Sequence, residues 1–565
     1  MRSKNLREHA PILFILMLAF AIRFAGIWFG LPDLYHADEP IVVNHAMAYG
    51  AGDLNPHFFK IPPLVSYLLF AVYGFYFFIS FLFGFVKSAE VFANHFLTNP
   101  TVFYLLGRIF FGAIFGTVTV YALYRLVKRF FSRECALLAA FFLSLAYLHV
   151  RDSHYIYTDI PLVLVLVLSF FPLLEILKSG ERRHYLHFGI LAGMAIATKY
   201  NGVFIFAPFV LVHWIKGHSQ RLRISNAHFF LAITSTFATF LILNPFSVID
   251  FHFFYHELLG QARSEGFMGF WHHVTYSLRE GLGLPLLLCS LAGMGLATSR
   301  KDQKSFIFSS FLLVYYGVLY FFSQPYDRYV LPLIPFLAFF AADFVVWLKQ
   351  KLNRGIFFYL LLCVLIAGPS MVKVCLLDQL LMKKDIRSIA KEWVENKIPP
   401  QTKIALGEPF FMPRLKPTLE QLIEKKQTNL IDKDFTTAQA KRLELLIQEA
   451  GRDSSSRYQL FFLKQEREGR EFLFSKPALS YDLAVLKTVG IKYVISSSSD
   501  QSSNAQFYSE LEKRADLTIQ FSPYKDGRIT LPIDREPLTG APLLWKELVA
   551  RNANGQAIKI YRLKD

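Results

Sequence analysis

Long apolar runs fill the first two thirds of this chain and restrict what it can fold into. They follow one another between residues 11 and 375, and each run of about 20 residues is long enough to cross a bilayer as a helix. Hydrophobic residues make up 53% of the chain and charged residues only 18%. The sequence therefore predicts a polytopic α-helical membrane protein.

The net charge of +17 raises the question of nucleic-acid binding. The basic residues, however, gather in short loops between the apolar runs, as they do in the cytoplasmic loops of membrane proteins. We therefore expect no nucleic-acid partner. The four cysteines lie in or beside apolar runs without the spacing of metal ligands, so we expect neither a disulfide framework nor a zinc site.

The basic residues also predict the orientation of the chain in the membrane. Arg2, Lys4 and Arg7 place the N-terminus in the cytoplasm, because positive residues stay on that side. The first span, residues 11–30, then delivers residues 31–100 to the outside as the first external loop. Residues 1–375 are thus expected to form one membrane domain.

The second apolar run, residues 63–86, does not fit this alternation as a span. If it crossed the membrane, the basic residues at 125–133 would fall outside. We therefore predict that residues 63–86 form a re-entrant or interfacial hairpin that returns to the outer face. About eleven spans satisfy the charge pattern, at residues 11–30, 101–127, 134–149, 159–177, 185–198, 201–216, 227–243, 280–298, 304–322, 328–348 and 355–375.

The composition changes after residue 375 to a charged and mixed sequence. Residues 376–565 predict a soluble α/β domain on the external face, with a role as a cap or in acceptor recognition. Strands are expected at 403–406, 459–463, 492–496 and 557–561, and helices at 385–396, 438–450 and 506–514. The serine-rich stretches at 454–456 and 496–503 are interpreted as flexible turns.

Ionisable residues gather in the first external loop, between two apolar segments. The stretch YHADEP contains Asp38 and Glu39, and GDLNPHFFKIPPL contains Lys60. Polar groups at such a position usually line the path of a substrate or an ion. On the predicted topology, three further polar stretches reach the same face: RDSHYIYTD at 151–159, TKYNG at 198–202 and QPYDRY at 324–329.

Acids and cations therefore meet on one side of the membrane. A carboxylate there can take the proton of a hydroxyl group, and Lys or Arg can neutralise a phosphate leaving group. A divalent cation could bridge the acids and the phosphate. These residue types suit a substrate that carries a phosphate and a hydroxyl group to be activated.

YHADEP, GDLNPHFFKIPPL, RDSHYIYTD, TKYNG and DRYVLPLIP follow one another in this order. As a set they resemble the GT-C glycosyltransferases, and more narrowly the branch of protein O-mannosyltransferases and lipid A aminoarabinose transferases. The resemblance covers roughly residues 1–375. It implies a membrane enzyme that moves a sugar from a polyprenyl-phosphate donor to a glycan, lipid or protein acceptor on the outer face, with inversion of the anomeric centre.

The resemblance also implies roles for individual residues. The expected catalytic acids are Asp38, Glu39 and Asp159. The expected ligands of the donor phosphate are Lys60, Lys199 and Arg328. The expected substrate contacts are His36, Asp152, His154, Tyr200, Asn201 and Tyr329. Asp38 and Asp159 are also the expected ligands of a divalent cation, Mg or Mn, although RDSHYIYTD departs from a simple Asp-x-Asp motif.

A transporter or lipid flippase is the alternative, because charges within a membrane also mark transport paths. Transporters commonly contain internal repeats and helices that are broken near the midplane. This sequence shows no repeat, and its charges gather at one face rather than at mid-membrane. We therefore expect an enzyme of the cell membrane, in contact with membrane lipids.

Overall fold

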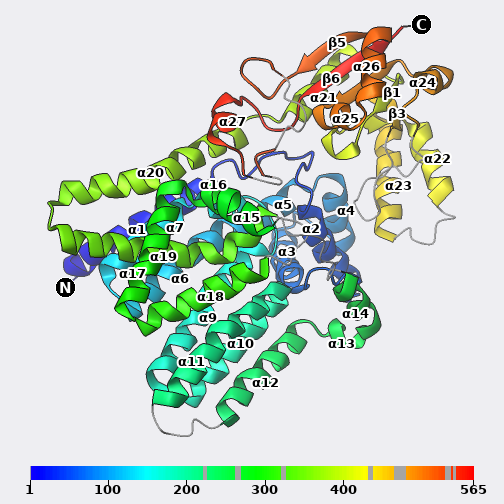
Figure 1. The fold of residues 1–565 in the computed structure, drawn as a ribbon. Coiled ribbons are helices and arrows are strands. Elements are labelled where there is room, and N and C mark those ends of the chain that lie inside the picture. The colour runs from blue at the N-terminus through cyan, green and yellow to red at the C-terminus, as the bar shows by residue number, and fades with distance from the viewer. Residues whose placement is uncertain are drawn as a thin grey trace.

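The computed structural model contains a helical part and a C-terminal α/β domain (Figure 1). It describes residues 2–219, 226–260, 269–319, 326–429, 437–463, 479–528, 536–538 and 542–564. In Figure 1 the domain, drawn in yellow to red, lies above the right-hand end of the helical part. The long helix α20 (Ile356–Leu381) runs along the top of the helical part and leads into the domain.

The helical part is built from α-helices and shorter 3₁₀ and π segments. Its other α-helices are α1 (Arg2–Phe24), α2 (Glu39–Ala48), α3 (Leu64–Leu82), α4 (Ala89–Thr98), α5 (Thr101–Gly107), α6 (Phe115–Phe130), α7 (Arg133–Leu145), α8 (Tyr147–Asp152), α9 (Asp159–Ser179), α10 (Arg182–Thr198), α11 (Phe206–Ser219), α12 (Asn226–Leu243), α13 (Phe246–Ile249), α14 (Phe251–Gly260), α15 (Gly269–His272), α16 (Leu278–Leu282), α17 (Leu284–Arg300), α18 (Gln303–Leu319) and α19 (Ile334–Leu352). The 3₁₀ and π segments are η1 (Tyr49–Ala51), η2 (Arg108–Ile114), η3 (Tyr200–Ile205), η4 (His273–Ser277) and η5 (Asp327–Leu333).

Six helical segments among the described residues are long and apolar enough to cross a bilayer. They are Leu64–Leu82, Thr101–Phe130, Asp159–Ser179, Asn226–Leu243, Asp327–Leu352 and Ile356–Lys397. A seventh candidate is a pair of helical segments bent by 112° between α16 and α17. Gly283 allows this bend, because its φ of 85° is a left-handed conformation that costs glycine little. The expected class of integral membrane protein is thus confirmed.

The expected spans coincide with helical segments over their described residues, since residues 320–322 lie outside them, but several of these helices are shorter than a full crossing. α7 has 13 residues, and α10 and α18 have 17 each. The expected single span at 280–298 is instead the bent pair α16 and α17. The number of spans, the cytoplasmic N-terminus and the external position of the C-terminal domain therefore stay predictions.

The segment expected as a hairpin contains one continuous helix. α3 has 19 residues with a mean hydropathy of 1.9, so the chain does not turn back before Leu82. The chain turns after α3, and Phe92 of α4 packs against Tyr76 and Phe77 with ring centroids 5.4 and 5.3 Å apart. The turn falls after Leu82, at the end of the run, because α3 contains no proline and its single glycine is tolerated inside a helix. An interfacial position of α3 stays a prediction.

The C-terminal domain contains a six-stranded mixed sheet with strand order β2-β3-β1-β4-β6-β5. β1 pairs in parallel with β3 and β4, whereas β6 pairs antiparallel with β4 and β5. The strands are β1 (Lys403–Leu406), β2 (Lys416–Pro417), β3 (Arg457–Phe462), β4 (Tyr493–Ser497), β5 (Ala515–Phe521) and β6 (Ile558–Leu563). The helices are α21 (Ile386–Lys397), α22 (Leu419–Asn429), α23 (Thr437–Arg452), α24 (Leu483–Val489), α25 (Ser498–Ser503), α26 (Ala505–Arg514) and α27 (Trp545–Ala550), with η6 (Pro409–Phe411).

The strands and helices expected in this domain are confirmed as β1, β3, β4 and β6 and as α21, α23 and α26. The edge strand β5 is missed, although its sequence ADLTIQF alternates apolar and polar residues. Ala515 is buried, and Ile519 and Phe521 pack against the core of the domain. The serine-rich stretch at 496–503 is not a flexible turn, which corrects the expectation. Ser497 ends β4 and caps α25, since its backbone amide donates to the Asp500 carboxylate at 2.9 Å and its hydroxyl accepts from the Asp500 amide.

Candidate active site

Asp38 lies on the loop between α1 and α2, at the N-cap of α2. Its side chain makes no capping hydrogen bond and instead contacts Arg328. The backbone amide of Asp38 donates to Nδ1 of His36 at 3.3 Å, and the buried His36 ring stacks on Tyr155 with centroids 4.0 Å apart. Burial lowers the pKa of His36, so its ring stays neutral near neutral pH and Nδ1 remains an acceptor. The His36 contacts thus fix the backbone at Asp38.

Arg328 reaches Asp38 from η5, 290 residues later in the chain. Its Nη1 donates to Oδ2 of Asp38, and its guanidinium lies 4.6 Å from the ring centroid of Tyr157 and 5.1 Å from that of Tyr326. The negative faces of both rings attract the guanidinium cation. The side chains of Arg328 and Asp38 keep 17% and 23% of their exposure, so a substrate can reach the pair.

A second ion pair joins Lys199 to Asp159. Nζ of Lys199 donates to Oδ1 of Asp159 at 2.6 Å, from the end of α10 to the start of α9. The amine lies 5.6 Å from the ring centroid of Tyr157 and 5.5 Å from that of Tyr329. Asp159 is only 2% exposed, whereas Lys199 keeps 14% of its exposure. The cation is therefore the more accessible partner of this pair.

The two ion pairs meet at Tyr157, because Arg328 and Lys199 both lie over its ring. Two expected acids and two expected phosphate ligands are thus brought together from four segments of the chain. We call Asp38, Asp159, Lys199 and Arg328 the charged quartet. Tyr157 was missed in the sequence, although it stands two residues before Asp159 in RDSHYIYTD, where the alternation of aromatic and polar residues was a usable signal.

Several polar atoms at the quartet are buried without a hydrogen-bond partner in the described part of the chain. They are Oδ2 of Asp159, Nε of Arg328 and Oδ1 of Asn201. Leaving such groups unpaired costs about 1–3 kcal/mol each, so native proteins rarely do so outside sites that bind a ligand or water. The amide of Asn201 is oriented by Tyr315, whose hydroxyl accepts from its Nδ2 at 2.6 Å. A ligand with both donors and acceptors would satisfy all three atoms.

The charged quartet contains two carboxylates and two cations, so an incoming anion must compete for the cations. An incoming phosphate competes with the carboxylates for Arg328 and Lys199, since both anions accept charge-assisted hydrogen bonds. A carboxylate that loses its cation becomes a stronger base. The arrangement can therefore couple the binding of a phosphate to the activation of Asp38.

The expected divalent cation does not fit this arrangement. Asp38 and Asp159 are each paired with a different cation. Hard divalent cations such as Mg²⁺ and Mn²⁺ take several oxygen ligands. Among the described residues, no group of three or more His, Cys, Asp or Glu side chains could hold a metal ion. We therefore assign no step to a metal.

Lys60 lies on a segment that is anchored on both sides. The carbonyl of the neighbouring residue Phe59 accepts from the Tyr200 hydroxyl at 2.8 Å, and the Phe59 amide donates to Glu257. The Lys60 side chain itself is exposed, with Nζ 5.9 Å from the Phe58 ring centroid. Because Tyr200 directly follows Lys199, its hydrogen bond ties the segment with Lys60 to the charged quartet. Tyr200 is thus an anchor of this loop rather than an evident substrate contact.

Glu39 does not join the quartet, although it follows Asp38. Its carboxylate binds Arg108 at 2.6 and 2.8 Å and also accepts from the Ile156 amide at 3.1 Å. The same guanidinium donates to the carbonyls of Ile27 and Phe29. The side chains of both partners are at most 1% exposed. The structure thus places Glu39 as the buried counter-ion of Arg108, and its expected catalytic role stays a prediction.

We expect Glu39→Gln to destabilise the protein without a direct effect on chemistry. It leaves the buried Arg108 charge without its counter-ion, which costs about 3–5 kcal/mol. Thermal unfolding of the detergent-purified protein measures the loss. Glu134→Gln is the control, because Glu134 pairs with Lys349 at an exposed site and should cost about 0–1 kcal/mol. Equal stability of the two variants would contradict the structural role.

Asp152 and His154 are buried and lie outside the charged quartet, so their expected contact with the substrate stays a prediction. Asp152 pairs with its neighbour Arg151 at 2.6 Å, and both side chains are at most 2% exposed. His154 contacts the carbonyls of Val150 and Ala25 at 2.9 and 3.0 Å through its two ring nitrogens. His154 thus joins the segment after α8 to Ala25, which follows α1, whereas the pair of Asp152 and Arg151 lies within α8. Of the acids in RDSHYIYTD, only Asp159 reaches the quartet.

One further pair beside the quartet was missed in the sequence. Oδ1 of Asp327 lies 3.2 Å from Nε2 of His272, at the end of α15. Asp327 is 2% exposed and directly precedes Arg328, so this contact fixes the start of η5. The signal was the acid in QPYDRY, where Arg328 and Tyr329, but not Asp327, were expected at the site. Gln324, in the same motif, lies outside the described residues.

The chain is similar to known proteins in part of its sequence and in its structure. A family model described as Dolichyl-phosphate-mannose-protein mannosyltransferase matches residues 102–244. No curated protein sequence matches the chain. The apo oligosaccharyltransferase of Archaeoglobus fulgidus is a similar solved structure, with 12% identity, coverage of 92% of this chain and 74% of the other, and a TM-score of 0.50.

Two other solved structures resemble the chain less closely in shape. ArnT from Cupriavidus metallidurans bound to undecaprenyl phosphate has 14% identity, coverage of 88% and 95%, and a TM-score of 0.48. The S. cerevisiae protein O-mannosyltransferase Pmt1-Pmt2 complex bound to the sugar donor has 22% identity, coverage of 49% and 37%, and a TM-score of 0.33. The family model and the archaeal structure confirm the expected resemblance to the GT-C glycosyltransferases at the level of the fold.

Proposed function

We propose that this chain is a membrane glycosyltransferase that moves a sugar from a polyprenyl-phosphate donor to an acceptor at the external face. The acceptor is a glycan, a lipid or a protein, and the anomeric centre is inverted. The observation that carries the proposal is the charged quartet with its unpartnered buried atoms. The matched family model, which describes transfer from a lipid-phosphate sugar, supports this class of donor.

Arg328 and Lys199 bind the donor phosphate in this mechanism. Nε of Arg328 has no partner among the described residues, so the guanidinium can donate two parallel hydrogen bonds to a phosphate. Lys199 supplies a second positive charge near the ring of Tyr157, and Lys60 lies on the segment that Tyr200, the residue after Lys199, holds through Phe59. These cations neutralise the charge that develops on the leaving phosphate, which lowers the barrier to its departure.

Asp38 acts as the general base once the phosphate has taken Arg328 from it. It accepts the proton of an acceptor hydroxyl, whose oxygen then attacks the anomeric carbon. The new carbon–oxygen bond forms on the face opposite the phosphate, and the bond to the phosphate oxygen breaks. Polyprenyl phosphate leaves with that electron pair. Oδ2 of Asp159 and Oδ1 of Asn201 are available to accept hydrogen bonds from sugar hydroxyls.

Tyr329 and His36 support these groups rather than react. Tyr329 presents its ring to Lys199 at 5.5 Å, and His36 holds the backbone amide of Asp38. The side chains of the quartet cluster at one place, where the ends of several helices meet. A flippase needs a path for the intact lipid and no base beside the phosphate, so the paired acid and cation favour transfer over transport.

The direct test is transfer by the purified protein in liposomes. Polyprenyl-phosphate mannose with a labelled sugar is the probe, and a detergent extract of the host envelope supplies the acceptors. We expect labelled sugar to appear in a new glycosidic product while unlabelled polyprenyl phosphate is released. Movement of the intact donor between leaflets without such a product would overturn the proposal in favour of a flippase. Repeating the assay with other polyprenyl-phosphate sugars then identifies the preferred donor.

A further inference from the structure

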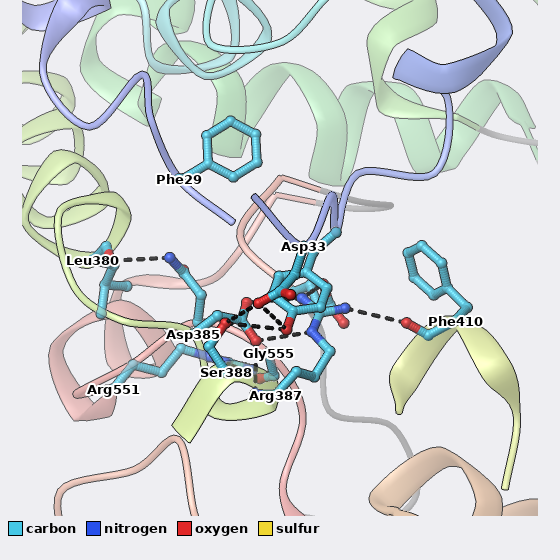
Figure 2. Close-up of polar contacts among 12 residues, drawn as sticks. Phe29, Asp33, Leu380, Asp385, Arg387, Ser388, Phe410, Arg551 and Gly555 are labelled. Atoms are coloured by element: carbon cyan, nitrogen blue, oxygen red, sulfur yellow. Dashed lines mark hydrogen bonds and ion pairs between the residues drawn. The ribbon is translucent and has the colours of Figure 1, made fainter. Parts of the chain in front are cut away.

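We infer that the C-terminal domain holds the loop that carries Asp38, with Ser388 and Lys391 of α21 as positioning residues for the transfer reaction. This inference rests on the proposed role of Asp38 as the base. The contact lies where α21, the first helix of the domain, meets the loop between α1 and α2 (Figure 2). We call residues 33–38 the catalytic loop.

Asp33 is the first residue of this loop that the domain binds. Its Oδ1 accepts from Nζ of Lys391 at 2.8 Å, and its Oδ2 accepts from the Ser388 hydroxyl at 2.9 Å. The Tyr35 hydroxyl lies 3.2 Å from Oδ2 of Asp33 and 3.1 Å from Oγ of Ser388. The Asp33 side chain is only 10% exposed. Both oxygens of Asp33 are therefore held by groups of one helix of the soluble domain.

Tyr35 is the second point of contact. Its buried ring lies beneath the guanidinium of Arg387, whose carbon is 4.0 Å from the ring centroid. Arg387 cannot move away easily, because it binds both oxygens of Asp385 at 2.8 Å and reaches Glu536 at 3.1 Å. Figure 2 shows Asp33, Arg387 and Ser388 gathered at this contact. The ring of Tyr35 is thus held by a cation that is itself fixed.

The contact continues along the backbone to the proposed base. His36 follows Tyr35, stacks on Tyr155 and accepts from the Asp38 amide. Leu34 lies between Asp33 and Tyr35 and has a φ of 59°. A non-glycine residue keeps this left-handed conformation only when its surroundings hold it. A loss of the domain contacts would therefore let the catalytic loop relax and shift Asp38.

The domain is itself fixed to the helical part at the junction of α20 and α21. The Ile386 amide donates to the carbonyl of Asn554 at 3.0 Å, and Nδ2 of Asn554 donates to the Leu380 carbonyl at 2.9 Å. Arg551 donates to the Gly555 carbonyl at 2.9 Å within the same segment. The segment before β6 therefore bridges the two helices, so α21 presents Ser388 and Lys391 at a set position.

The test compares Lys391→Met with Lys441→Met in the full-length protein. Lys441 of α23 pairs with Glu90 of α4 at 2.9 Å, so it also joins the domain to the first external loop, but at an exposed site on α4. Hydrogen exchange of residues 33–38 reports on the loop, and transfer kinetics report on Asp38. We expect Lys391→Met to speed exchange about tenfold and to lower kcat about tenfold with an unchanged donor KM. Lys441→Met should alter neither.

The charge-reversed pair Asp33→Lys with Lys391→Asp should recover kcat relative to either single variant, which loss of folding would not explain. Exchange in Lys391→Met equal to that in Lys441→Met would overturn the inference. Faster exchange with an unchanged kcat would also overturn it, because the contact would then be structural only. If the wild-type protein transfers no sugar, the proposed function fails, and the exchange comparison alone still decides whether the domain holds the loop.

Discussion

Asp38→Asn is expected to lower kcat for sugar transfer by about 10²–10⁴-fold, the usual contribution of a general base. An amide cannot accept the proton of the acceptor hydroxyl, although it has nearly the same size as the carboxylate. Asn is also a good N-cap residue, so the start of α2 should persist. The measurement is the initial rate of labelled product from a polyprenyl-phosphate sugar, with donor and acceptor both saturating.

The control for Asp38 is Asp53→Asn, on the segment between α2 and α3. Asp53 is 62% exposed and pairs with His57 at 2.8 Å, so its loss should leave transfer near the wild-type rate. Purified protein of each variant should be monodisperse and should melt within a few degrees of the wild type. A wild-type rate in Asp38→Asn would remove Asp38 from the mechanism, and Asp159 would become the next acid to test.

Arg328→Met is expected to lower kcat/KM for the donor by about 10²–10³-fold. The loss of one positioned donor to a developing anion typically has this size, and here the guanidinium also carries the charge that faces the phosphate. Arg328→Lys should recover only part of the activity, because an ammonium group cannot donate two parallel hydrogen bonds or stack on Tyr157 and Tyr326 in the same way. Steady-state kinetics with varied donor concentration measures both effects.

The matched control for Arg328 is Arg300→Met. Arg300 pairs with Asp343 at 3.2 Å, and Asp343 lies further along the helix that follows η5. This pair is of the same type but about 20 Å from Arg328, given the helical rise per residue. The double variant Asp38→Asn with Arg328→Met should lose less than the sum of the single losses in free energy, because the two side chains are in contact. Full additivity would argue against their joint action.

The class of protein and most elements of its fold could be read from the sequence. Apolar runs locate helices because a bilayer admits only segments whose backbone hydrogen bonds are satisfied internally. Alternating and β-branched stretches likewise located β1, β3, β4 and β6. The missed strand β5 alternates apolar and polar residues, so its sequence did contain a strand signal, whereas the short helix α25 lies in a serine-rich stretch with a weak pattern. The bend at Gly283 also had a signal, since Gly281, Gly283 and Pro285 stand together at the start of an apolar run.

The sequence could locate the candidate site, but it could not show which of the polar residues there lie at the charged quartet. Asp38 and Glu39 are adjacent, yet one contacts Arg328 and the other is buried against Arg108. Successive residues at the start of a helix point about 100° apart, since a turn takes 3.6 residues, so neighbours face different surroundings. Asp152 and Asp159 are equally buried, but their partners differ, since Asp152 pairs with Arg151 and Asp159 pairs with Lys199 at the quartet.

The sequence by itself determined a helical membrane protein with acids and cations in a few polar stretches and a separate α/β domain. Only the tertiary structure decided which of these charges meet. Arg328 lies 290 residues from Asp38, and Lys391 lies 358 residues from Asp33. Such partners leave no periodic pattern in the chain, because their contact depends on how helices and the domain pack. Local chemistry can be read along a sequence, whereas pairing of charges is a property of the fold.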